Sequence, residues 1–192
     1  FCEEGKLNEI DTSEKAELAA ETFTDMGYIS VLSTIPTLSI LEEENPDGSD
    51  RLGSSIVHLD GHGSPTHIRF TYKNKGNSGN IKYNTGVSKK KSDEGLFGPD
   101  HPIFVPITDI DVKDTRLMIF CACETANSDV ESTPIAKYAY IRGVETSLGW
   151  AEDIPVTVSG EWNERFYKKL KLGYSVGDAA DYADEYFNIS SP

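Results

Sequence analysis

The segment Arg116-Leu117-Met118-Ile119-Phe120-Cys121-Ala122 is a nearly continuous apolar run, and it leads directly into Cys123-Glu124-Thr125. Short apolar runs without alternation are typical of strands that are buried in a parallel sheet. A second run of this kind, residues 55–59, leads directly into Asp60-Gly61-His62-Gly63. We therefore expect two buried strands, each of which ends beside a reactive side chain, His62 on one strand and Cys123 on the other. In open α/β sheets, chemistry takes place outside the carboxyl ends of the strands.

Helical patterns alternate with strand patterns on both sides of these segments. Periodicity and capping residues predict helices at residues 13–26, 36–44, 132–142, 157–172 and 175–187, the last opening with Ser175-x-x-Asp178. Further strands are predicted at residues 28–33 and 144–150, and a β-hairpin at residues 67–86. The order predicts an α/β sandwich with a mostly parallel sheet of roughly six strands between helices, plus a small hairpin.

Length and composition predict one domain across residues 1–192, with residues 1–12 as a candidate linker. Residues 87–99 are polar, lysine-rich and punctuated by glycine, so we expect a mobile loop there. No run of about 18 apolar residues occurs, so no membrane association is expected. The chain begins with Phe1 and without a signal pattern, as in a processed or excised chain, which leaves a secreted, cell-surface or cytoplasmic location open. The oligomeric state is left open as well.

The charge distribution argues against nucleic acid as a partner. The chain has 18 basic and 32 acidic residues, for a net charge of −14. Contacts to phosphates need a basic surface, which this balance does not favour. Residues 61–92 nevertheless carry +7, which leaves −21 on the rest of the chain.

The cysteines indicate a reduced thiol. Cys2, Cys121 and Cys123 are odd in number and include no Cys-x-x-Cys pair, so neither a disulfide framework nor a zinc ribbon is expected. A cysteine nucleophile needs a base such as a neutral imidazole and N–H donors for the oxyanion. His62-Gly63 and Cys123 meet these needs if the two strand ends lie together.

Four motifs resemble those of the caspase-like cysteine peptidases, in particular the CHAT and separase-like group, with clostripain and gingipain as more distant relatives. His58-Leu59-Asp60-Gly61-His62-Gly63 resembles the histidine strand end, and Phe120-Cys121-Ala122-Cys123-Glu124-Thr125-Ala126 resembles the nucleophile strand. Gly149-Trp150-Ala151-Glu152-Asp153 and the helix that contains Phe166-Tyr167 are similar to downstream motifs. The resemblance covers roughly residues 55–185 and departs from the family at Cys121, where the family has serine.

The resemblance implies a caspase-like three-layer sandwich and a cysteine endopeptidase that acts on a peptide or protein. Cys123 would attack the scissile carbonyl, His62 would act as general base and then general acid, and the N–H groups of Gly63 and Cys123 would form the oxyanion hole. Cys121, Trp150 and Asp153 would line the pocket for the residue before the cut. No organic cofactor is implied, although some relatives use calcium.

The resemblance also suggests two finer properties. Asp153, desolvated beside Trp150, would favour Arg or Lys before the cut, with a small apolar residue as the second choice. Some clostripain-like relatives mature by cutting a basic loop, so Lys89, Lys90 and Lys91 are candidate self-processing sites, with an uncut solvated loop as the alternative.

Other interpretations stay open. His58, Asp60, His62 and His67 offer metal ligands within ten residues, which would suit a zinc hydrolase. A non-catalytic binding module of the same fold is a third possibility. Among single residues, Cys121, His58 and Trp150 have purely structural alternatives, and Asp153 has an alternative role as the N-cap of the helix that follows it.

Overall fold

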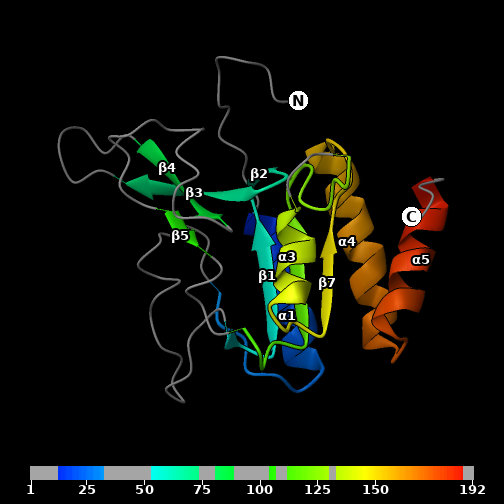
Figure 1. Cartoon of the computed structure of the whole chain (residues 1–192). Helices are drawn as coiled ribbons and strands as arrows, with labels where there is room; N and C mark the ends of the chain where they lie inside the picture. Colours follow the sequence, from blue (N-terminus) through cyan, green and yellow to red (C-terminus); the bar gives the residue numbers. More distant parts are fainter. Residues whose placement is uncertain are drawn as a thin grey trace. The chain divides into compact units, whose positions relative to one another are not determined.

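The computed structural model describes residues 13–32, 53–73, 81–88, 104–106, 112–129 and 133–187. The chain divides into two compact units, one formed by residues 1–34 with 154–192 and the other by residues 35–153. Figure 1 shows the helices and strands of both units.

A three-stranded parallel sheet forms the centre of the unit of residues 35–153. Its strands are β1 (Ile56–Asp60), β6 (Leu117–Cys121) and β7 (Thr146–Gly149), in the order β1-β6-β7. All five residues of β6 are buried, which explains why this strand is apolar throughout. The helix α3 (Ile135–Ile141) packs on β6 and β7 (Figure 1). The core of the unit consists of Val57, Leu59, Ile68, Val112, Met118, Phe120, Ala122, Ile135, Ala136, Ala139 and Val144.

A second sheet begins immediately after β1, because only Gly61 separates β1 from β2 (His62–Ser64). The strand β2 pairs antiparallel with β3 (His67–Lys73), and β3 pairs antiparallel with β4 (Ile81–Ser88). A short strand, β5 (Phe104–Pro106), adds to β4 in parallel. The predicted hairpin is therefore confirmed, and it belongs to a four-stranded sheet in the order β2-β3-β4-β5.

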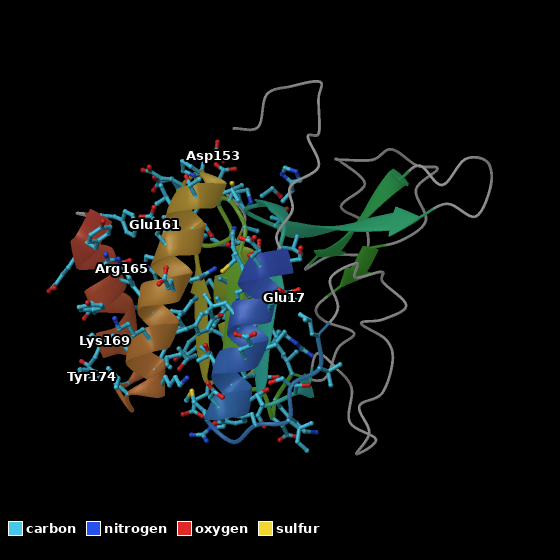
Figure 2. All side chains as sticks on the ribbon, turned by 180° about the vertical axis from the view of Figure 1, so that it is seen from behind. Glu17, Asp153, Glu161, Arg165, Lys169 and Tyr174 are labelled. Carbon is cyan, nitrogen blue, oxygen red and sulfur yellow. The ribbon has the colours of Figure 1, made fainter. Side chains whose placement is uncertain are left out.

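Three helices make up the described part of the other unit: α1 (Ser13–Asp25), α4 (Val156–Lys171) and α5 (Val176–Phe187). The helix α4 packs against both α1 and α5. Between α1 and α4, Phe23 lies edge-on to Tyr167 at 5.5 Å between ring centroids, and within α4 Trp162 stacks on Phe166 at 4.8 Å. Figure 2 shows Glu161, Arg165 and Lys169 following one another along α4.

The start of α5 forms as its sequence predicts. The Asp178 backbone N–H donates to Ser175 Oγ at 3.1 Å, so the serine satisfies one of the first N–H groups of the helix. The Ser175 hydroxyl in turn donates to Asp178 Oδ2 at 2.7 Å.

The mixed α/β class, the parallel strands β1, β6 and β7 and the four described helices are confirmed within a few residues of their predicted bounds. The predicted strand at residues 28–33 is wrong over its described part, residues 28–32, which form no strand. The side chains there do not form a buried face, and Ile29 is 93% exposed. An apolar run forms a strand only where it has a partner strand and a surface to pack on.

The expectation of one sheet of roughly six strands is also corrected. The strands of the described residues divide between the parallel sheet and the sheet that β2 begins. The predicted mobile loop starts too early, because Val87 and Ser88 still belong to β4. The rest of that loop, the predicted helix at residues 36–44 and the candidate linker lie outside the described residues. Among the described helices, none combines the length and the apolar character needed to cross a bilayer.

Candidate active site

The segments that carry His62 and Cys123 touch each other through their backbones. A Cβ built on Gly63 would lie 2.6 Å from the Cβ of Ala122 and 2.7 Å from the carbonyl oxygen of Cys123. Real Cβ atoms essentially never approach backbone atoms so closely, so only glycine fits at position 63. The structure thus brings His62-Gly63 against Ala122-Cys123, as expected for the carboxyl ends of neighbouring strands.

Cys123 and His62 are both half-buried at this junction. Cys123 forms no disulfide and lies in the turn that follows β6, and His62 is the first residue of β2. A partly exposed thiol beside an imidazole-bearing segment is an arrangement in which nucleophilic thiolate chemistry occurs.

Thr125 holds the turn after Cys123 in place. Its side chain is fully buried, and its hydroxyl donates to the carbonyl oxygens of Ala122 at 2.8 Å and Phe120 at 3.3 Å. The same hydroxyl accepts the Trp150 backbone N–H at 3.3 Å. One side chain therefore ties the end of β6 to the end of β7. The sequence places this threonine within a motif, but no local pattern indicates its role.

Glu124, directly after Cys123, has a left-handed backbone with φ of 57°. Left-handed conformations are costly for residues other than glycine and concentrate at functional sites. The Glu124 N–H donates to the Glu152 carbonyl at 3.2 Å, and the Asn127 N–H donates to the Glu124 carbonyl at 2.9 Å. These bonds hold the sharp turn that directly follows Cys123.

The segment after β7 and the start of α3 complete the support of the turn. The Ala126 N–H donates to the Trp150 carbonyl at 2.8 Å, and the Ala136 N–H donates to the Thr125 carbonyl at 3.0 Å. The Ile135 N–H donates to the Pro65 carbonyl at 2.7 Å, which ties α3 to the segment after β2. Both strand ends are thus fixed to the same helix.

A second group of reactive side chains lies on β1 and β6, apart from Cys123 and His62. Asp60 and Cys121 are register partners on the two parallel strands, and His58 lies two residues before Asp60 on the same face. Ligand atoms of His58, Asp60 and Cys121 all lie within 4.8 Å of one another. The His58 and Asp60 side chains are only 7% and 4% exposed, and Cys121 is 4% exposed.

The electrostatics of this second group favour a protonated imidazole. Burial, the largest single influence, lowers the pKa of His58. The negative charge of Cys121 and the hydrogen bonding and charge of Asp60 together outweigh burial, and they raise this pKa from 6.5 to about 10. His58 Nε2 lies 3.8 Å from Asp60 Oδ2. The buried His58 imidazole therefore carries a proton at neutral pH in the metal-free protein.

This geometry divides the set of residues that the sequence suggested as metal ligands, which were His58, Asp60, His62 and His67. His58 and Asp60 are grouped with Cys121, and His62 is not part of any such group within the described residues. Strand alternation would have put residues 58, 60 and 62 on one side, but β1 ends at Asp60 and a new strand begins at His62. The position of the His67 side chain lies outside the described part of the structure.

The remaining predicted residues lie after β7. Trp150 is half-buried, and Asp153 is exposed (Figure 2). The expected desolvation of the Asp153 carboxylate beside Trp150 is therefore wrong. The alternative role of Asp153 as a helix N-cap is also wrong, because Pro155 occupies the N-cap position of α4 and no side chain caps it. Lys89, Lys90 and Lys91 lie outside the described residues.

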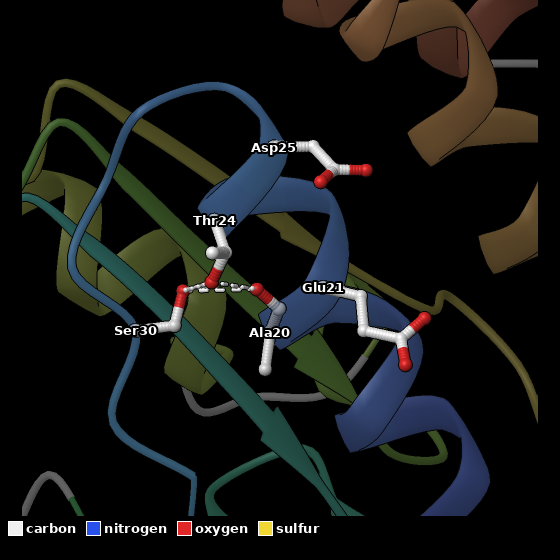
Figure 3. A pocket seen from close by; sticks show the side chains of 5 residues that line it. All are labelled: Ala20, Glu21, Thr24, Asp25 and Ser30. Atoms are coloured by element: carbon white, nitrogen blue, oxygen red, sulfur yellow. Dashed lines mark hydrogen bonds between the residues drawn. The ribbon is translucent and has the colours of Figure 1, made fainter.

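A shallow pocket lies on the helical unit and contains none of these residues. Figure 3 shows its lining residues, which are Ala20, Glu21, Thr24, Asp25 and Ser30. Its hydroxyl groups bond locally: Thr24 donates to Ser30 Oγ at 3.0 Å, and Ser30 donates to the Ala20 carbonyl at 2.9 Å. These bonds stabilise the end of α1 and indicate no ligand.

No family model matches the chain, and no curated protein matches it in sequence. The resemblance to caspase-like peptidases therefore rests on the four sequence motifs.

Proposed function

We propose that this chain is a caspase-like cysteine endopeptidase that cleaves peptide bonds through a thioester intermediate. The observation that carries the proposal is the contact of Gly63 with Ala122 and the Cys123 carbonyl, which places the histidine-bearing and cysteine-bearing segments together. The hydrogen bond from Thr125 to the Ala122 carbonyl and the one from the Trp150 N–H to Thr125 hold the turn that carries Cys123. A nucleophile must be held in one position to react efficiently.

In the proposed reaction His62 takes the thiol proton of Cys123, and the thiolate sulfur attacks the carbonyl carbon of the scissile peptide bond. N–H groups of Gly63 and Cys123 stabilise the oxyanion. His62 then gives the proton to the leaving amine as the carbon–nitrogen bond breaks, which leaves a thioester on Cys123. Water, deprotonated by His62, hydrolyses this thioester and releases the carboxylic acid product and the free thiol.

Active-site labelling tests this proposal. An acyloxymethyl-ketone probe is expected to alkylate Cys123, located by mass spectrometry, and to fail with Cys123→Ala. His62→Ala is expected to abolish peptide hydrolysis, while Cys121→Ser leaves a folded enzyme with at least partial activity. A probe that labels Cys121 instead, or hydrolysis that survives Cys123→Ala, would show that the nucleophile is misassigned. A folded protein that neither reacts nor hydrolyses any peptide would favour the binding module.

We further propose that the residue before the cut is Arg or Lys. The charge of −21 outside residues 61–92 and the exposed carboxylate of Asp153 both attract cationic peptides. A fluorogenic peptide library scanned at this position is expected to select Arg or Lys, and Asp153→Asn is expected to weaken that selection. Selection of acidic or aliphatic residues, or an unchanged preference in the folded variant, would contradict the assignment.

Self-processing at Lys89, Lys90 or Lys91 is a related proposal. Incubation of the active protein beside Cys123→Ala, followed by sequencing of new N-termini, tests it. New ends after a lysine in the active protein alone are expected, and identical patterns in both proteins would exclude self-cleavage.

A further inference from the structure

We propose that His58, Asp60 and Cys121 form a binding site for a zinc ion, separate from Cys123 and His62. The site goes beyond the proposed peptidase activity, because neither residue of the catalytic pair belongs to it. The three donors are an imidazole nitrogen, a carboxylate oxygen and a thiolate sulfur, which are the ligand types that zinc takes in proteins.

The backbone fixes the placement of the donors. Asp60 and Cys121 are Cα partners in the parallel pairing of β1 and β6, so their side chains leave the sheet on the same side. His58 precedes Asp60 by two residues and therefore joins them on that face. A site built on two hydrogen-bonded strands is held more rigidly than one built on loops.

The distances suit a tetrahedral ion. With metal–ligand bonds of about 2.0–2.3 Å, donor atoms around zinc lie roughly 3.5 Å apart. His58 Nε2 and Asp60 Oδ2 are 3.8 Å apart, and all three donors lie within 4.8 Å of one another. Small rotations of the side chains bring them onto one ion, with a fourth position left for water or another ligand.

Burial and charge favour an ion at this position. The side chains of Asp60 and Cys121 are almost fully removed from water, and a carboxylate and a thiolate in such a place are stable only beside a positive charge, which the zinc ion would supply in place of the His58 proton. The two anionic ligands would neutralise the charge of the divalent ion, and binding would release the proton that His58 carries in the metal-free protein, so that a neutral imidazole becomes the third ligand. Thiolate and imidazole ligands select zinc over calcium and magnesium, which prefer oxygen.

The sequence alone pointed to a different set of ligands. Spacing within residues 58–67 suggested His62 and His67, because those residues are close in sequence. Cys121 is 61 residues after Asp60, and only the pairing of β1 with β6 brings the two together.

Metal binding to the purified full chain tests the proposal. The metal-free protein is titrated with Zn²⁺ against a chromophoric chelator, and one equivalent is expected to bind in the presence of excess Ca²⁺ and Mg²⁺. His58→Gln, Asp60→Asn and Cys121→Ser are each expected to weaken binding more than about tenfold. His62→Ala, His67→Ala and Cys123→Ser are matched controls that are expected to bind zinc as the wild type does.

Cobalt supplies a readout that does not depend on the folding of the ligand variants. The chain has three cysteines, so Cys121 is the sole thiol in the Cys2→Ser/Cys123→Ser protein. With Co²⁺ that protein is expected to show a thiolate-to-cobalt charge-transfer band together with tetrahedral visible bands. Absence of the thiolate band in it, or loss of zinc binding in Cys123→Ser, His62→Ala or His67→Ala, would overturn the site. The Cys123→Ser variant lacks the proposed nucleophile but keeps the three proposed zinc ligands. Zinc binding by this variant therefore tests the metal site whether or not the wild-type protein is a peptidase.

Discussion

Gly63 and Ala122 lie so close together that a methyl group on Gly63 would come within 2.6 Å of the Ala122 Cβ. This contact joins the start of β2 to the residue that precedes Cys123, although the two positions are 59 residues apart in the chain. The catalytic proposal needs this proximity, and so does the packing of the core, in which Ala122 is 1% exposed.

Gly63→Ala is expected to lower the free energy of unfolding by about 1–3 kcal/mol, because the added methyl group meets backbone atoms that cannot move aside. Gly160→Ala in α4 is the matched control. Among the described residues outside its own helix backbone, a Cβ there comes within 4 Å of Lys15 Cε alone, at 3.9 Å, so higher helix propensity is expected to stabilise the protein by up to about 1 kcal/mol. Urea unfolding measures both variants, and equal effects would show that the close contact is absent in solution.

The sequence predicted the elements around the site well, because their signals are local. Apolar runs gave β1 and β6, and the box Ser175-x-x-Asp178 marked the start of α5. The two strand ends were expected to meet because parallel neighbours share an edge, and the contact of Gly63 with Cys123 agrees with this.

Features that depend on the exact register between distant strands could not be predicted. The grouping of His58 and Asp60 with Cys121 follows from the register of β1 and β6, which no local pattern encodes. The role of Thr125 depends on the position of Trp150 at the end of another strand. Residues 28–32 have a local apolar pattern that predicts a strand, but they form none, because they pair with no strand among the described residues.

Thr125→Val is expected to destabilise the protein by about 1–3 kcal/mol. Valine keeps the shape of threonine but removes the hydroxyl that accepts the Trp150 N–H, and with it the donor to the Ala122 carbonyl. Thr125→Ser retains the hydroxyl and is expected to lose less than Thr125→Val. Chemical denaturation of the two variants gives the comparison. If serine costs more than valine, the methyl group matters more than the hydrogen bonds.

Position 124 is expected to prefer glycine over alanine. Both Glu124→Gly and Glu124→Ala remove the contact of the side chain with Asn127, but only glycine adopts a φ of 57° without strain. The glycine variant should therefore be more stable than the alanine variant by roughly 1–2 kcal/mol. Thermal unfolding of the pair measures this difference. Equal stability would mean that the left-handed conformation next to Cys123 stores no strain.

The last prediction concerns the pH dependence of stability in the metal-free protein. The pKa of His58 is raised from 6.5 to about 10, so the folded state binds this proton more tightly than the unfolded chain does. The resulting stabilisation is present in full below pH 6.5 and is lost progressively as the pH rises towards about 10. Within this window, His58 alone lowers the free energy of unfolding by up to about 1.4 kcal/mol per pH unit.

A comparison with His58→Gln isolates this contribution, because all other titrating groups, including His62, are present in both proteins. Urea unfolding with a chelator present is measured at intervals between pH 6 and pH 10. The difference in stability between wild type and variant is expected to be largest at the acid end and to shrink steadily towards the alkaline end. A stability difference that stays constant with pH would mean that Asp60 and Cys121 do not hold a proton on His58. A stability difference that grows as the pH rises would mean that the pKa of His58 is lowered in the folded protein instead of raised.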